Sequence, residues 1–236
     1  MSIDSVEVIK YLHEFFPERA ASLMFYLEQR NAEEKKLEEW RINQIGKLMM
    51  SLTINTVEME RAFSESRIST LAWTARNLLE ISVWIDYCNL SSTHADRFRK
   101  DAARDGLGLT KAIQAMYVEK SGAEHVGLKE AQDRLANFAA SVMGIPALDD
   151  NFERVLKAAE EVGRGKEFSS KNKMFSKLAH PTAWAINSVN SIEADAEFRG
   201  MFLEDGVTTA TSSLTRLREF IIGQYPTDRL ETTWPV

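Results

Sequence analysis

The apolar positions of the chain recur with a period close to 3.6 residues, which is the pattern of amphipathic helices. Asp4 and Glu7 predict a capping box at the start of the first helix. Pro17 either ends that helix or begins the next one. In MFLEDGVTTAT the residues on either side of Asp205-Gly206 do not alternate regularly between apolar and polar, as the strands of a hairpin would. We therefore expect one helix to stop and another to start at Asp205-Gly206. Further helices are expected over about 109–120, 128–143, 150–162, 168–179 and 207–222.

The segment from about 66 to 90 is apolar on every side, unlike the other predicted helices. Such a helix normally lies at the centre of a fold. The predicted fold class is therefore all-α, a bundle of about eight or nine helices around a central helix near 66–90. The stretch AEEKKLEEWR indicates a solvated helix face.

The few glycines and prolines mark the expected boundaries between elements. We expect the charged helix HADRFRKDAARD to end at Gly106, and Gly163 to cap the C-terminus of another helix. Gly163 to Lys166 lacks the preceding strand of a phosphate loop and is interpreted as a turn. One helical domain, 1–236, is predicted, with an N-terminal helical extension over 1–63, a core over 64–222 and an irregular tail over 223–236.

The composition excludes several classes of protein. The 236 residues carry a net charge of −6, which does not support a nucleic-acid partner, although a local basic patch would still permit one. The single cysteine, Cys88, rules out an internal disulfide framework and fits a cytoplasmic protein. No stretch has the ~20 apolar residues of a membrane span, and no secretory signal begins the chain. No metal site or cofactor is predicted.

Arg76 and Glu80 are four residues apart on the predicted central helix, so they share one helix face. Charges on a central helix are costly unless they are paired. The pair therefore has three interpretations: a buried ion pair that fixes the register of the helix, a polar pocket in which Arg76 binds an anion or Glu80 handles a proton, or an exposed face.

His180 precedes Pro181 in FSKLAHPTAW, and a residue before proline is disfavoured in helical geometry. It is either a capping or core residue between two helices or an imidazole available for acid–base work or ligand binding. Ser176 lies four residues earlier, but without a third orienting group the two make a weak nucleophile and base. The remaining histidines, His13, His94 and His125, are interpreted as surface or capping residues.

The segments ARNLLEISVWIDY, ADRFRKDAARD and FSKLAHPTAW resemble a family of uncharacterised bacterial helical proteins over roughly residues 64–190. The family elements are an Arg-x-x-x-Glu helix, an Ala-x-Arg-Phe segment and a Ser-x-x-x-His element. The resemblance carries no established activity. It implies that four side chains meet in space: Arg76, Glu80, Arg97 and His180.

A more distant similarity is to HEPN-type helical domains, whose ribonuclease members carry an arginine four to six residues before a histidine. The present sequence departs from that pattern, because none of these positions before His94, His125 or His180 is an arginine. A ribonuclease of this kind would have to use residues from separate helices, with His180 as the base and Arg76 or Arg97 holding the phosphate.

No catalytic motif is present, so the sequence favours a protein without enzymatic activity. We expect a binding module that recognises an unknown protein partner or a small anionic ligand through the interior cluster of Arg76, Glu80, Arg97 and His180. Another copy of the chain would also be an acceptable partner. The alternative is a HEPN-like ribonuclease or stress and defence effector.

Overall fold

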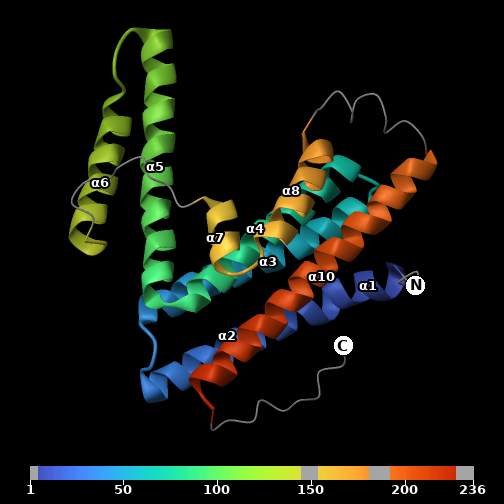
Figure 1. Ribbon diagram of the computed structural model, residues 1–236. Helices are drawn as coiled ribbons and strands as arrows, with labels where there is room; N and C mark the ends of the chain where they lie inside the picture. The colour runs from blue at the N-terminus through green and yellow to red at the C-terminus, as the bar shows by residue number, and fades with distance from the viewer. Residues whose placement is uncertain (1–4, 145–153, 181–191, 227–236) are drawn as a thin grey trace. The chain divides into compact units, whose positions relative to one another are not determined.

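The computed structural model describes residues 5–144, 154–180 and 192–226, and these residues form helices joined by short connections (Figure 1). No strand occurs among them, which confirms the all-α prediction. In this part of the chain, no helix combines the length and the apolar character needed to cross a membrane. The elements are α1 (Ser5–Lys10), the π-helix η1 (Tyr11–Phe15), α2 (Phe16–Glu34), α3 (Glu39–Ser64), α4 (Ile68–Leu90), α5 (Ser92–Ser121), α6 (Val126–Val142), α7 (Val155–Glu161), α8 (Gly165–Ala179) and α10 (Ile192–Gln224).

The chain divides into two compact units. Unit 1 comprises Met1–Ser92 and Val155–Val236, and unit 2 comprises Thr93–Arg154. Helices α2 and α3, from the predicted extension 1–63, pack within unit 1: α3 against α4, and both against α10. The described part of unit 2 consists of α5 from Thr93 onward and α6.

Helix α4 is the centre of unit 1, as its apolar pattern predicts. It packs against α3, α7, α8 and α10 (Figure 1), and its buried residues are spread around the helix. Its large aliphatic side chains Leu71, Leu78, Leu79, Val83 and Ile85 have no exposed surface. Burial of each such side chain contributes about 1.5–3 kcal/mol relative to exposure, so α4 supplies much of the stability of unit 1.

The predicted helix stop at Asp205-Gly206 is wrong, because α10 runs through both residues. Gly206 is needed there for close packing. A Cβ atom at this position would lie 2.2 Å from the sulfur of Met59 on α3 and 3.4 Å from a methyl group of Leu78 on α4. The glycine lets three helices approach one another and does not mark a turn.

The predicted end of a helix at Gly106 is also wrong. Helix α5 continues through Gly106 and Gly108 to Ser121. A Cβ atom added at Gly106 would contact only Leu135, at 3.5 Å, and one added at Gly108 would point into open space. Neither glycine marks a break in the helix. A glycine inside a helix lowers its stability by about 1 kcal/mol relative to alanine, and a helix as long as α5 still forms.

The stretch AEEKKLEEWR contains a turn between α2 and α3, so its interpretation as one solvated helix face is wrong. Lys35 ends α2 in the left-handed region, with φ 51°, and Leu37 is buried. The side chain of Asn31 accepts a hydrogen bond from the backbone N–H of Leu37 at 2.8 Å and donates one to the carbonyl oxygen of Leu37 at 3.0 Å. The Tyr225 hydroxyl donates to the same Asn31 oxygen at 3.0 Å, which ties the end of α10 to this turn.

Other predicted boundaries are confirmed where the structure describes them. Pro17 lies in the first turn of α2, so it begins a helix. Gly163 has φ +76°, and the hydrogen bonds from Gly163 N to Glu160 O and from Arg164 N to Ala159 O form the glycine cap of α7. Gly163 to Lys166 contains the turn between α7 and α8. Asp4, Pro181 and 227–236 lie outside the described residues, and so does the start of the helix expected over 150–162.

Candidate functional site

The side chains of Arg76, Glu80 and His180 come together on unit 1. The Arg76 Nε atom donates to Glu80 Oε1 at 3.0 Å, and its Nη1 atom lies 3.1 Å from His180 Nε2. A guanidinium has no acceptor, so His180 Nε2 must accept this hydrogen bond, and a neutral imidazole then carries its proton on Nδ1. Arg76 therefore links one residue of its own helix to one at the end of α8.

The positions of these residues follow from local structure. Arg76 and Glu80 are one helical turn apart on α4, which brings their side chains within reach. His180 follows the last residue of α8 and has φ −112° and ψ 152°, the extended geometry expected of a residue before proline. His180 is thus the C-cap residue of α8, and its backbone conformation directs the ring to α4.

The group is partly open to solvent. The side chains of Arg76 and Glu80 are 28% and 29% exposed, and His180 is exposed. The interpretation as a fully buried ion pair is therefore wrong, and so is the interpretation as a fully exposed face. Trp73, one turn before Arg76, is also exposed. The group lies at the surface of unit 1 rather than in its interior.

Two other residues, Arg97 and Ser176, were expected from the sequence to accompany this group. Arg97 lies on α5 in unit 2, whereas the other three residues belong to unit 1. Ser176 lies on α8, but no hydrogen bond joins it to His180. His13 is exposed and lies 3.1 Å from Glu60 Oε2, His94 is half-buried near the start of α5, and His125 is exposed at the N-cap of α6. These histidines confirm the surface or capping interpretation.

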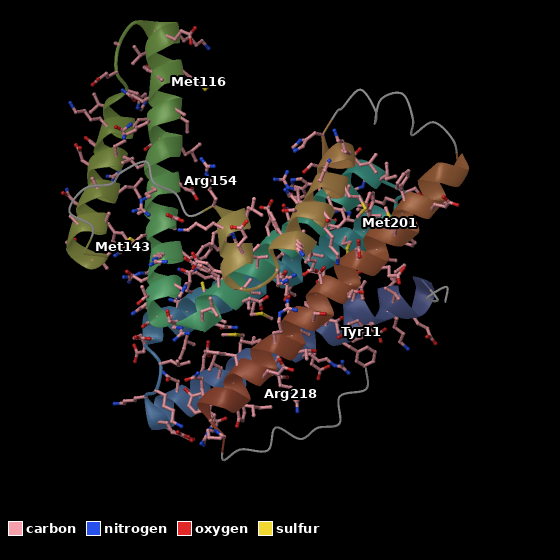
Figure 2. The ribbon with its side chains drawn as sticks, in the orientation of Figure 1. Tyr11, Met116, Met143, Arg154, Met201 and Arg218 are labelled. Carbon is pink, nitrogen blue, oxygen red and sulfur yellow. The ribbon has the colours of Figure 1, made fainter. Side chains whose placement is uncertain are left out.

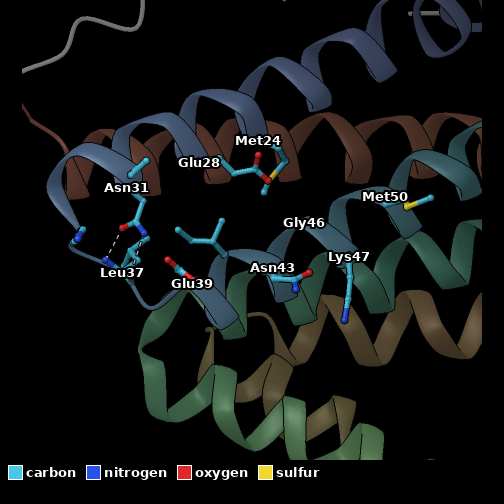
Figure 3. A pocket seen from close by; sticks show the side chains of 12 residues that line it. Met24, Glu28, Asn31, Leu37, Glu39, Asn43, Gly46, Lys47 and Met50 are labelled. Atoms are coloured by element: carbon cyan, nitrogen blue, oxygen red, sulfur yellow. Dashed lines mark hydrogen bonds between the residues drawn. The ribbon is translucent and has the colours of Figure 1, made fainter.

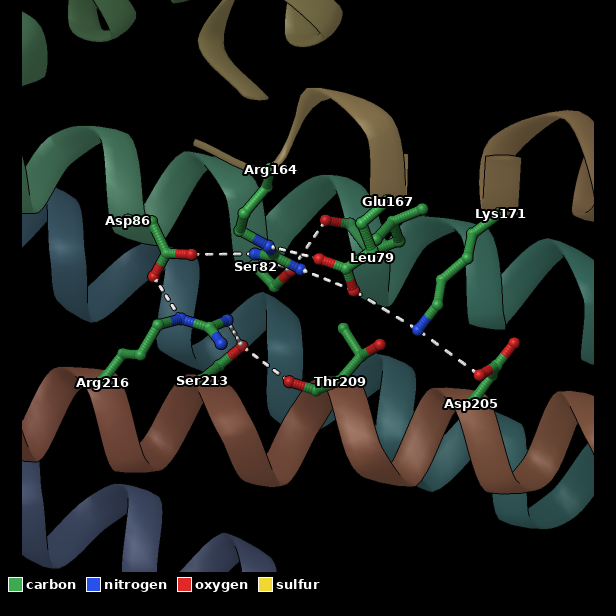
Figure 4. Close-up of polar contacts among 10 residues, drawn as sticks. All are labelled: Leu79, Ser82, Asp86, Arg164, Glu167, Lys171, Asp205, Thr209, Ser213 and Arg216. Carbon is green, nitrogen blue, oxygen red and sulfur yellow. Dashed lines mark hydrogen bonds and ion pairs between the residues drawn. The ribbon is translucent and has the colours of Figure 1, made fainter. Parts of the chain in front are cut away.

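A second polar cluster, not predicted from the sequence, joins α4, α8 and α10 (Figure 4). Its centre is Asp86, whose side chain is 9% exposed. The Asp86 carboxylate accepts from Arg164 Nη1 at 2.8 Å and from Arg216 Nε at 2.7 Å. Arg164 also donates to Ser82 at 2.9 Å and to Glu167 at 2.9 Å.

The cluster continues along α8 to α10. Lys171 Nζ lies 3.3 Å from Glu167 Oε1 and 3.4 Å from Asp205 Oδ1. Burial alone would lower the pKa of Arg164, but the hydrogen bond with Glu167 and the charge of Asp86 outweigh it, so the pKa is raised. Burial would raise the pKa of Glu167, but the hydrogen bond and charge of Arg164 together with Lys171 lower it. The described part of the cluster balances three cationic side chains against three carboxylates.

Because each charge in this cluster has an opposite partner, the arrangement holds three helices together and offers no free charge for chemistry. The signal that could have indicated it is the acidic residue Asp86 on a helix apolar on all sides. Its two arginine partners are 78 and 130 residues away in the chain, and no local spacing rule connects them. Beside the cluster, a surface groove of about 600 Å³ is bordered by Leu90, Glu219 and Phe220.

A larger groove of about 790 Å³ lies between α2 and α3 (Figure 3). Its charged residues have both signs, with Glu28 and Glu39 opposing Lys35 and Lys47. Gly46 faces Met24, whose terminal methyl group lies 3.3 Å from the place that a Cβ would occupy. None of the residues predicted as a site lines this groove.

Arg41 and Cys88 form a buried contact at the C-terminal end of α4. Arg41 donates to the carbonyl oxygens of Cys88 and Asn89, each at 3.0 Å, and so satisfies groups that have no partner within the helix. Burial lowers the pKa of Arg41. Burial also raises the pKa of Cys88 to about 12, so its thiol is unreactive at neutral pH.

The described residues contain no group of three or more His, Cys, Asp or Glu side chains that could hold a metal ion. Comparison with known proteins gives no match of this chain to a family model, to a curated protein or to a solved structure. The assignment of a function therefore rests on the geometry of Arg76, Glu80 and His180.

Proposed function

We propose that the chain is a binding protein without enzymatic activity, and that Arg76 and His180 bind a small oxyanion or an anionic group of a partner. The observation that supports this is the position of the Arg76 guanidinium, which is partly exposed and bridges Glu80 and His180. Described residues use only two of its five N–H donors, and the others can bind a phosphate or carboxylate.

Binding of an oxyanion at this site competes with the contacts that Arg76 already makes. Glu80 offsets the charge of Arg76, and the C-terminal end of α8 adds a partial negative charge. An oxyanion placed between Arg76 and His180 replaces their mutual hydrogen bond and can also accept a hydrogen bond from the His180 ring.

Sulfate is a suitable probe because its oxygen atoms match the bidentate geometry of a guanidinium. We expect sulfate to shift the NMR resonances of His180 with saturation. Arg76→Met should weaken this binding at least tenfold. Arg61→Met is the matched control, because Arg61 also pairs at 3.0 Å with a glutamate four residues later, Glu65, but has no histidine partner.

Equal sulfate binding by the wild type and by Arg76→Met would overturn the proposal. So would loss of binding in Arg61→Met to the same extent, because the effect would then be one of net charge alone.

A HEPN-like ribonuclease is the second candidate, and the 3.1 Å distance between Arg76 and His180 favours it. A phosphate held by Arg76 would lie within reach of the imidazole, as a general base requires. Purified protein should then cleave RNA, and His180→Ala and Arg76→Ala should each abolish cleavage without changing the helical circular dichroism. RNA that stays intact with the wild-type protein would rule this candidate out.

A further inference from the structure

Helices α5 and α6 leave large apolar side chains exposed. Leu109 and Met116 on α5 are 63% and 70% exposed, and Val142 on α6 is 59% exposed. The buried apolar residues that the structure describes in unit 2 are all alanines: Ala95, Ala103 and Ala139. Met143, labelled in Figure 2, packs against Ala103 and Ala139. The hairpin of α5 and α6 thus has a thin core of its own and a large apolar surface outside it.

Apolar side chains that are exposed or half-buried form a stripe on each helix. On α5, Ala102, Leu109, Ile113 and Met116 are spaced by seven, four and three residues, which places them on one face. Asp105 interrupts this stripe one turn before Leu109. On α6 the stripe consists of Ala131, Leu135, Phe138 and Val142, with the same helical spacing.

Both stripes lie on the same face of the hairpin. Gly106 of α5 faces Leu135 of α6, and Ala103 packs with Ala139, so these residues define the line along which the helices touch. Each stripe is centred to one side of that line, by about 80° on α5 and about 50° on α6, in the same rotational sense along its own helix, and Leu135 lies at the edge where stripe and line meet. Because the two helices are antiparallel, rotations of the same sense bring both stripes to one side.

We propose that this face binds the same face of a second copy of the chain, so that two hairpins close a four-helix bundle. Two helices alone cannot enclose a core, whereas four can, with their apolar stripes turned inward. A two-fold axis is the simplest symmetry for such a dimer, because the same apolar face of each copy then forms the interface.

The distribution of charge supports a second copy as the occupant. Residues 93–144 carry eight Lys and Arg against seven Asp and Glu, a net charge of +1. With −6 for the whole chain, the remaining residues carry −7. Two nearly neutral hairpins can approach without repulsion, whereas pairing through the acidic remainder would bring like charges together.

The size of the face is also sufficient. Helix α6 has 17 residues and is therefore about 25 Å long, and two adjacent helices are roughly 20 Å across. The flat projection of the face is thus about 500 Å², and its side chains increase the accessible surface beyond this value. Specific interfaces bury about 600–1,000 Å² on each partner, so the hairpin face reaches the lower end of that range.

Sedimentation equilibrium of the full-length chain tests this proposal. The wild type should show a reversible monomer–dimer equilibrium between micromolar and near-millimolar concentration. Ile113→Glu and Phe138→Glu place a charge on the face from different helices, and each should weaken the dimer at least tenfold. Both positions are exposed, so the helical circular dichroism of the variants should be unchanged.

Val118→Glu is the matched control. Val118 is also an exposed apolar residue of α5, but it lies half a turn away from the stripe. The Val118→Glu variant should dimerise as tightly as the wild type. A wild type that remains monomeric at every concentration would overturn the proposal. A dimer that tolerates both Ile113→Glu and Phe138→Glu, or one that Val118→Glu disrupts equally, would also do so.

Discussion

Arg164, the N-cap residue of α8, donates a hydrogen bond to the Asp86 carboxylate at 2.8 Å and thereby joins the start of α8 to the central helix (Figure 4). Arg216 approaches the other oxygen of the same carboxylate from α10. One buried carboxylate therefore holds two cationic side chains from helices that are far apart in the sequence.

Replacing Asp86 by asparagine should be strongly destabilising. The substitution keeps the size of the side chain but removes the carboxylate that pairs with Arg216 and one of those that pair with Arg164, which is 13% exposed. Removing one member of a buried ion pair costs about 3–5 kcal/mol, and we expect a loss of about 3 kcal/mol in the free energy of unfolding. Urea unfolding measures it, with Glu65→Gln in an exposed pair as the control that should change stability by about 0.5 kcal/mol or less. Equal effects of the two substitutions would contradict the structural role of Asp86.

The lowered pKa of Glu167 predicts a defined loss of stability in acid. A carboxylate with a lowered pKa in the folded state contributes stability above its ordinary value of 4.5, and this contribution is lost as the pH falls through the lowered value. The difference in unfolding free energy between wild type and Glu167→Gln should be constant above about pH 5 and shrink below about pH 4.5. Urea unfolding at several pH values checks this. A difference that stays constant through the acid range would contradict it.

Gly206→Ala should destabilise the protein although alanine favours helices. The added methyl group would lie 2.2 Å from the sulfur of Met59, which is fully buried and must move. Overpacking of this kind costs about 1–3 kcal/mol, more than the gain of about 1 kcal/mol in helix propensity. Gly200→Ala on the same helix has no atom within 4 Å of the new methyl and should be stabilising. Thermal unfolding of both variants distinguishes the outcomes, and a stabilised Gly206→Ala would show that α10 is not closely packed there.

Arg76→Met should have little effect on stability. Its pair with Glu80 is more than a quarter exposed on each side, and partly exposed pairs contribute about 1 kcal/mol or less. Arg164→Met, in the buried cluster, should cost roughly three times as much. If Arg76→Met were the more destabilising of the two in urea unfolding, Arg76 would be a structural residue, and the proposed oxyanion site would lose its basis.

The central position of α4 could be predicted because it depends on a local property. A helix of 23 residues with apolar side chains on several sides is stable only when neighbouring helices cover most of them. The predicted contact of Arg76, Glu80 and His180 is also found, and proline after His180 gave a local reason for its extended backbone. Residues 181–191, in which a further helix was expected, lie outside the described residues.

The errors occurred at glycines and at contacts between distant segments. Gly106 and Gly206 were interpreted as helix ends, but whether a glycine breaks a helix or allows a neighbour to approach depends on what packs against it. For Gly206 that neighbour is Met59, 147 residues earlier in the chain. The Asp86 cluster was missed for the same reason, since its arginines are adjacent to Asp86 only after α8 and α10 have packed on α4.

The burial of Cys88 makes it an internal probe of the stability of α4. Thiol reagents attack the thiolate, and the Cys88 side chain is covered in the folded state, where burial raises its pKa to about 12. Reaction therefore requires unit 1 to open around the end of α4. In the native protein, without any introduced label, the modification rate of this one cysteine measures how often the helix that carries Arg76, Glu80 and Asp86 separates from its neighbours.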